Sequence, residues 1–268
     1  MLSRSLSRKL VRPASQSGIT RPSVDFLNLG MNAAWINTWS GAWVFNNLMY
    51  HSELPDQSIG SGAYTYDQGL LTASVPTNKF RIKLADHELR LPPGEYTVIN
   101  PDRLKVHIGG WNSPSSSASY RTDAEFTVTI NAVVDTALCI HIEGSITANN
   151  GNLAVILPGQ AAEWKAGNVW NKQFLDFYKA MDVKVIRAMD WTWASSNIET
   201  DWSDRVRANG ISLRSGHGSG SIVPYEFMCD LAQRLSAEIW VCIPHRATPD
   251  CREQMAQLFA ANYPSGKT

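Results

Sequence analysis

Cysteine is scarce in this sequence, and its four cysteines are not spaced for a metal site. Cys139, Cys229, Cys242 and Cys251 form no CxxC pair and no metal-binding spacing with the six histidines. We therefore expect free, mostly buried thiols in a protein assembled in a reducing compartment, with no bound metal and no cofactor. A disulfide between Cys229 and Cys242, or between either one and Cys251, remains an alternative.

Long apolar runs and an excess of one charge are also absent. No stretch of about 18 apolar residues occurs, so the sequence predicts no membrane span. The formal net charge is zero, and several basic residues precede the first acid, Asp25. The body after them is mildly acidic, which argues against nucleic acid as a partner. The 268 residues, 44% hydrophobic and 18% charged, predict an ordinary globular protein.

Tryptophan is abundant, with ten residues. An indole ring stacks on apolar faces while its N–H finds an acceptor, and Trp-rich proteins often handle sugars or large partners. The alternative is that many of these rings only fill the core.

Residues 1–24 predict a short basic amphipathic arm. Leucines and arginines alternate every two residues, so at helical spacing they occupy different faces: Leu2, Arg4, Leu6, Arg8, Leu10 and Arg12. The arm is too short to be stable alone. It has the composition of a mitochondrial transit peptide, of a solvated tail or of a docking arm. It also resembles the Ser/Arg/Leu/Pro-rich N-termini of virion proteins of tailed bacteriophages, which implies docking to other virion proteins.

The stretch Val183 to Trp193, VKVIRAMDWTW, organises the rest of the chain. It begins as a buried strand and ends on Asp190, Trp191 and Trp193, and ligands of α/β sheets bind at that carboxyl end. EIWVCIPH, Glu238 to His245, has the same design, and the two strands with a helix between them predict a βαβ unit.

The remaining segments predict four regions: the arm, 1–24; a first strand and a helix Ala42 to Tyr50, within 25–58; a sheet-rich region, 59–157; and an α/β region, 158–268. Region 59–157 contains six alternating strands separated by turns, which indicates an antiparallel β-sandwich. The strands are expected at residues 80–84, 95–99, 104–108, 125–130, 138–142 and 153–157. In the last region we predict helices at Lys172 to Met181, at Pro224 to Leu235 and after an N-cap at Thr248. The first of these helices is expected to bury its apolar residues Phe174, Leu175, Phe177, Tyr178 and Met181.

Three segments together resemble a family of cellulose-binding-annotated, glycoside-hydrolase-like proteins of bacteria and phages. They are GMNAAWINTWS, NKQFLDFYKAMDVKVIRAMDW and VPYEFMCDLAQRLSAEIWVCIPH. The resemblance covers roughly Asn28 to the end. It implies a (β/α)8 barrel of clan A type with a β-sandwich inserted after strand one, and strands one to three at Asn28 to Thr38, Val183 to Trp191 and Glu238 to Pro244.

If the chain is aligned with that family, it lacks the family's catalytic carboxylates. Retaining glycosidases need two carboxylates about 5 Å apart, and the family carries them on strands four and seven, beyond Thr268. No catalytic residue is therefore expected within this chain. We expect the chain to be the N-terminal part of a longer protein, or a remnant completed by something else.

The candidate substrate-binding residues are Trp39, Arg187, Asp190, Trp191, Trp193 and His245. The three indoles are candidates for stacking on sugar rings. Asp190 is a candidate base with His245 as proton shuttle, or it only bonds neighbouring loop amides. Arg187 is suited to orienting a carboxylate, and for His245 substrate contact and loop structure remain open.

Three functions follow from these expectations. The first is a virion-associated fibre or spike protein whose arm and sandwich anchor a barrel that binds host polysaccharide, in an oligomeric assembly. The second is a cellular glycoside hydrolase with an ancillary sugar-binding sandwich. The third is a non-catalytic lectin-like module.

Overall fold

The computed structural model describes residues 29–36, 38, 42–53, 64–67, 70–73, 79–86, 91–111, 120–130, 137–144, 152–193, 199–210, 212–213 and 222–263. The predicted docking arm, with Arg4, Leu6, Arg8, Leu10 and Arg12, lies outside these residues. So does Trp39. Both predictions stay predictions.

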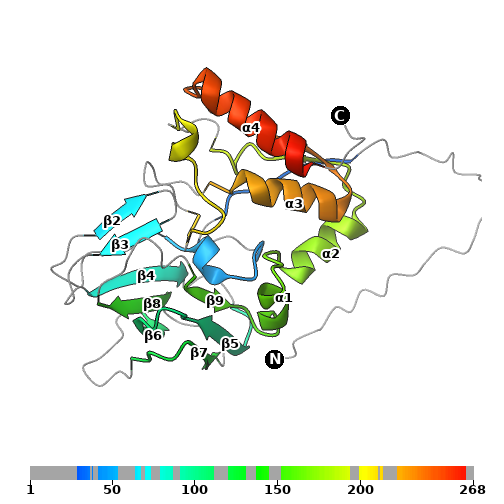
Figure 1. The fold of residues 1–268 in the computed structure, drawn as a ribbon. Helices are drawn as coiled ribbons and strands as arrows, with labels where there is room; N and C mark the ends of the chain where they lie inside the picture. The colour runs from blue at the N-terminus through cyan, green and yellow to red at the C-terminus, as the bar shows by residue number, and fades with distance from the viewer. Residues whose placement is uncertain are drawn as a thin grey trace, which may run out of the picture.

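A three-stranded parallel sheet forms one half of the described structure. Its strands are β1 (Gly30–Asn32), β10 (Val185–Arg187) and β11 (Glu238–Trp240), in the order β1-β10-β11. They lie at the three predicted positions and are shorter than predicted. Among the described residues the sheet does not close into a barrel, so the fold is mixed α/β with several small sheets (Figure 1).

Helices α2 (Lys172–Ala180), α3 (Tyr225–Leu235) and α4 (Pro249–Asn262) accompany this sheet. Thr248 caps α4 by accepting a bond from the Cys251 N–H, as predicted, and Asn171 caps α2 in the same way from the Gln173 N–H. A short helix, α1 (Ala161–Lys165), precedes α2, and a 3₁₀ turn, η3 (Trp202–Asp204), contacts α4.

The buried face of α2 is narrower than predicted. Leu175 and Tyr178 are buried, but Phe177 is 53% exposed and Met181 is 45% exposed. The prediction that all five apolar residues of this helix pack inward was therefore wrong. The buried arc of the helix runs through Asn171, Leu175 and Tyr178, which are four and three residues apart, and Phe177 lies to one side of it.

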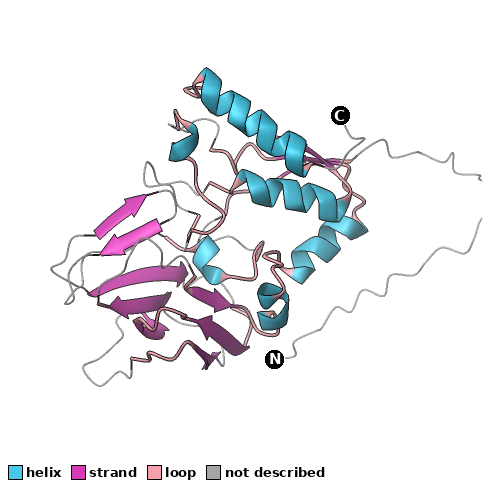
Figure 2. Ribbon diagram, in the orientation of Figure 1, coloured by secondary structure: helices cyan, strands magenta, loops and turns pink. Residues whose placement is uncertain are grey.

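Two three-stranded antiparallel sheets form the other half (Figure 2). One has the order β4-β8-β6 and the other β7-β5-β9. The bounds are β4 (Lys79–Ala85), β5 (Gly94–Ile99), β6 (Lys105–Gly110), β7 (Glu125–Ile130), β8 (Leu138–Glu143) and β9 (Ala154–Ile156). All six predicted strands are present. Their inward residues share one hydrophobic core, because side chains of both sheets belong to it.

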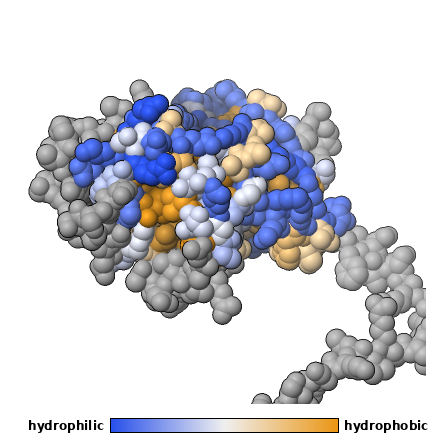
Figure 3. All heavy atoms as spheres, turned by 90° about the horizontal axis from the view of Figure 1, so that it is seen from below, coloured by the Kyte–Doolittle hydropathy of each residue, from blue (hydrophilic) through white to orange (hydrophobic). Residues whose placement is uncertain are grey.

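A separate hairpin, β2 (Tyr64–Asp67) with β3 (Leu70–Ala73), was not predicted as such. Seen from below, the molecule shows hydrophobic residues in the middle of the face, bordered by hydrophilic and by grey atoms (Figure 3). All four cysteines are free, and three of them are buried, as expected.

The segment 42–53 joins the two halves, and we call it the seam. It was predicted to be helical, but only η1 (Leu48–His51) forms, as one 3₁₀ turn. Phe45 makes a β-bridge with Trp170, while Asn47 makes one with Ile156. These bridges join the seam to both halves, and they engage backbone groups of Val44 and Asn46 that a helix would need. Leu48 and Met49 enter the sandwich core, whereas Phe45 and Tyr50 enter the α/β core.

His51 predicts a measurable pH dependence of stability. It is fully buried in the seam, its Nε2 accepts a bond from the Phe45 N–H, and its Nδ1 has no partner among the described residues. Burial lowers its pKa from 6.5 to about 3. Below pH 6.5 His51 is therefore protonated in the unfolded chain but stays neutral in the folded chain. Its contribution lowers the free energy of unfolding as the pH falls from 6.5 toward 3.

Between pH 7 and 4.5 we expect this residue to remove about 2 to 3 kcal/mol from the free energy of unfolding. Urea denaturation of wild type and His51→Gln at both pH values measures it, because a glutamine oxygen can replace Nε2 as acceptor without titrating. Equal losses in the two proteins would contradict the assignment. His141, whose pKa burial lowers to about 4, leaves a smaller residual slope in both.

Candidate functional site

An aromatic cavity lies between the loop that follows β1, the seam and helix α2. Its volume is about 480 Å³. Six aromatic side chains line it: Trp35, Trp43, Phe174, Phe177, Tyr178 and Trp191. Trp35 is 49% exposed and Phe177 is 53% exposed, so two rings remain accessible at the wall. Gln173 adds a side-chain amide to the lining.

Trp191 forms the buried floor of this cavity. It is only 2% exposed, and its Nε1–H donates to the Ala34 carbonyl at 2.9 Å. The ring is stacked against Trp170, with centroids 5.9 Å apart and planes at 20°. The structure therefore places this predicted stacking residue mainly within the core, where at most one edge meets a ligand.

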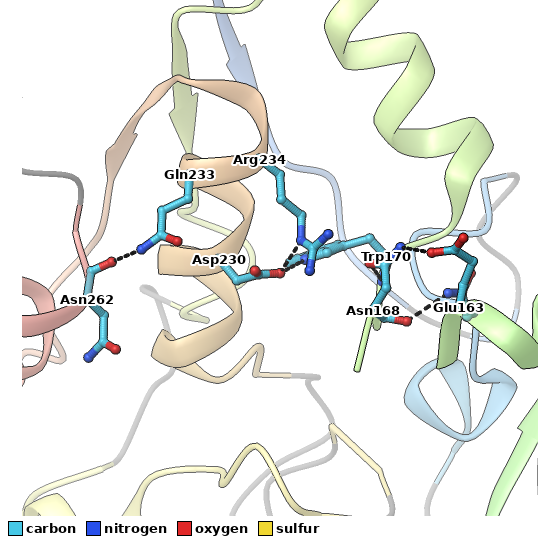
Figure 4. Close-up of polar contacts among 8 residues, drawn as sticks. Glu163, Asn168, Trp170, Asp230, Gln233, Arg234 and Asn262 are labelled. Carbon is cyan, nitrogen blue, oxygen red and sulfur yellow. Dashed lines mark hydrogen bonds and ion pairs between the residues drawn. The ribbon is translucent and has the colours of Figure 1, made fainter. Parts of the chain in front are cut away.

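Trp170 holds the floor in position. The fully buried ring also stacks on Phe45, with centroids 4.9 Å apart, and on Phe174, with centroids 5.9 Å apart. Its Nε1–H donates to Asp230 Oδ2 of α3 at 2.6 Å, and Arg234 Nε donates to the same oxygen at 2.7 Å (Figure 4). The charged acceptor makes this a strong bond.

The same network continues to α1. The Asn168 side chain accepts from the Trp170 N–H at 3.2 Å and donates to Glu163 at 3.1 Å, and Figure 4 shows these residues converging from three elements. Near the same end of α3, the Gln233 amide donates to the Asn262 carbonyl of α4. Hydrogen bonds and stacked rings thus hold the floor of the cavity in place, and a binding site needs such support.

Trp193 lies beside the cavity and contacts Trp35. The two ring centroids are 4.6 Å apart with planes at 47°. Trp193 has a φ of +51°, in the left-handed region that L-residues other than glycine avoid. Such a backbone costs about 1 to 2 kcal/mol. Strained residues persist where surrounding contacts fix them and concentrate at functional sites, which keeps Trp193 a candidate.

The remaining candidates lie at the carboxyl ends of β10 and β11. Arg187 ends β10, and its Cζ is 4.9 Å from the ring centroid of Trp240. Asp190 lies half-buried in the turn after β10, where its carbonyl accepts from the Trp193 N–H. His245 is exposed in the loop after β11. No hydrogen bond joins Asp190 to His245 within the described ranges, so the base and shuttle pairing has no structural support.

Sequence reasoning missed Trp35 and Trp240. Each had an available signal. Trp35 follows the first strand at nearly the same distance as Trp191 follows the second, and Trp240 occupies the alternate position of β11 that does not face the helices. Phe174 and Phe177 were assigned to the core, although both line the cavity.

Comparison of this chain with models of known protein families, with curated proteins and with solved structures finds no match. In the part of the chain that is described, no three His, Cys, Asp or Glu side chains gather as a metal site. The helices among these residues are all too short or too polar to cross a bilayer. The chemistry of the site therefore follows from its own geometry, which offers stacking surfaces and few polar groups.

Trp35 and Trp191 differ in what their removal should cost. Trp191→Ala empties a buried site and should reduce the free energy of unfolding by about 3 to 5 kcal/mol. Trp35→Ala removes a half-exposed ring that contacts Trp193 and should cost about 1 kcal/mol or less. Denaturant titration of both variants measures the difference. Comparable losses would mean that Trp35 is a core residue and is not available for a ligand.

Proposed function

We propose that the protein is a glycan-binding module and that the aromatic cavity holds the sugar. The observation that carries this proposal is a cavity of about 480 Å³ with six aromatic rings in its walls. Sugar rings present apolar C–H faces that match the area of an indole, and small-ligand sites are mostly apolar with a few placed polar groups. The volume lies in the range of about 300 to 1,000 Å³ that such sites occupy.

The polar groups of the cavity suit hydroxyl recognition. Gln173 can both donate and accept through its amide. Burial raises the pKa of Tyr178, so its hydroxyl stays protonated and can donate. Trp35 and Phe177 supply half-exposed rings at the wall. A ligand with alternating apolar faces and hydroxyls satisfies both kinds of group.

The order of the parallel strands supports the glycoside-hydrolase-like architecture that we include in the proposal. Strands β1, β10 and β11 lie side by side in chain order and parallel, as the first three strands of a (β/α) barrel would. The two antiparallel sheets occur between β1 and β10 in the sequence, which agrees with a sandwich inserted after strand one.

We propose binding and not hydrolysis for the described site. Glycoside hydrolysis uses a pair of carboxylates that flank the scissile bond. The described residues that directly follow the three parallel strands contain a single carboxylate, Asp190. Stacking without a carboxylate pair holds a sugar but does not cleave it.

Binding to a glycan array, followed by calorimetric titration of the best ligand, tests the proposal. We expect Trp35→Ala to weaken binding by about 30-fold, because truncating an aromatic anchor costs about 2 kcal/mol. Trp111→Ala in the sandwich is the matched control. Its ring already lies under Arg81, whose Cζ is 3.2 Å from the ring centroid, so we expect unchanged affinity. If only Trp111→Ala weakens binding, the sugar site belongs to the sandwich.

We further propose that residues 1–24 dock this module to a virion appendage such as a tail fibre or spike. The support is the alternation of leucine and arginine in the arm, which lies outside the described residues. Deleting residues 1–24 should abolish incorporation into particles and leave glycan affinity unchanged. Mass spectrometry of purified particles and the same titration measure both. A deleted protein that still enters particles would show that the arm is not the docking element. Absence of the full-length protein from particles would favour the cellular hydrolase or the plain lectin-like alternative.

A further inference from the structure

Three side chains form a row across the parallel sheet, on the face away from the helices. Arg187 is in register with Asn32 of β1 and with Trp240 of β11. Their neighbours Met31, Ile186 and Ile239 point to the opposite face, where they pack in the α/β core. Side chains alternate along a strand, so the three residues lie side by side at the carboxyl ends of the strands.

Arg187 is a cation without an acidic partner among the described residues. Its Cζ lies 4.9 Å from the Trp240 ring centroid, and its Nε is shielded from solvent with no hydrogen-bond acceptor. Other arginines differ. The half-buried Arg205 pairs with Glu226 at 3.1 Å, and the exposed Arg234 pairs with Asp230 at 2.7 Å. A partly desolvated cation without a counter-ion is costly, and an anion that reaches it recovers that cost.

Trp240 supplies an open ring beside this cation. It is 58% exposed, although parallel sheets are normally covered on both faces. Asn32 is exposed on the other side of Arg187 and offers an amide. The row thus combines the guanidinium of Arg187, the indole of Trp240 and the amide of Asn32. These groups match a sugar that carries a carboxylate on its ring.

We propose that the row Asn32, Arg187 and Trp240 binds the carboxylate of a uronic acid in an anionic polysaccharide. The guanidinium donates to both carboxylate oxygens, the indole covers the apolar face of the same sugar, and the Asn32 amide contacts a hydroxyl. This inference rests on the proposed glycan-binding function and adds the charge of the ligand. Glu238 lies on the same face, two residues before Trp240, and opposes the anion.

The test uses the full chain and two probes, oligogalacturonate and uncharged galactose oligomers of equal length. Wild type should bind the uronate at least ten-fold more tightly, with a preference that falls as salt rises. Arg187→Gln should abolish the preference, so that the two oligomers bind with similar affinity. Arg187→Lys should keep only part of the preference, because lysine lacks the fork.

Two further variants serve as matched controls. Arg252→Gln removes an exposed charge on α4, away from the row, and should change neither affinity. Glu238→Gln removes the opposing charge and should increase the affinity for uronate. A preference that survives Arg187→Gln, or is lost equally in Arg252→Gln, would overturn the inference. Preference for a sulfated oligomer over the uronate would overturn the carboxylate assignment.

If Arg187→Gln does not fold, the wild-type protein decides the question. In an NMR titration, the Trp240 indole N–H signal, assigned through Trp240→Phe, should shift with the uronate and not with the uncharged oligomer. No shift with uronate would overturn the inference. If the protein binds the uncharged oligomer without a preference for uronate, the row is not a uronate site, but the aromatic cavity can still be the glycan site. If it binds neither probe, the proposed glycan-binding function is contradicted as well.

Discussion

The hydrogen bond from the buried Trp170 indole to Asp230 fixes the geometry on which the α/β half depends. A buried indole N–H without an acceptor is costly, and this one is satisfied by a carboxylate that Arg234 also holds. The bond sets how α3 lies against the segment before α2. Because Phe45, Phe174 and Trp191 all stack on the same ring, the bond also sets the floor of the cavity.

The seam connects this part of the α/β half to the sandwich. Phe45 pairs with Trp170 on one side, and two residues later Asn47 pairs with Ile156 and accepts the Val155 N–H through its side chain. One short segment thus supplies residues to two hydrophobic cores. The two halves are therefore joined through this segment, although their secondary structures differ.

Much of the fold could be predicted from local patterns. Most of the six sandwich strands alternate, as in Glu125 to Ile130, and the N-cap at Thr248 and the proline at the start of α3 are local signals, so these elements were identified at nearly the right bounds. The seam was not predictable in this way. Its sequence has helical spacing, but its backbone bonds go to Val169, Asn171 and Leu157, which are far along the chain. Tertiary pairing overrode local preference.

The site was predictable only in its location. The acid and indoles after β10 indicated the carboxyl end of the sheet, but burial decides which ring a ligand can touch, and burial depends on Trp170 and α2. Trp191 was predicted to be accessible to a ligand, but it is buried in the floor of the cavity. Phe177 was predicted to be buried, but its ring is half-exposed.

The pairing of β1 with β10 has a consequence for the order in which the chain folds. Met31 faces Ile186, and the whole sandwich is encoded between them. Closing so long a loop is entropically unfavourable, and a sandwich that has already folded shortens it by bringing its own ends together. On the ribosome, β1 is made first and has to wait, unpaired, until the strand it depends on has been synthesised.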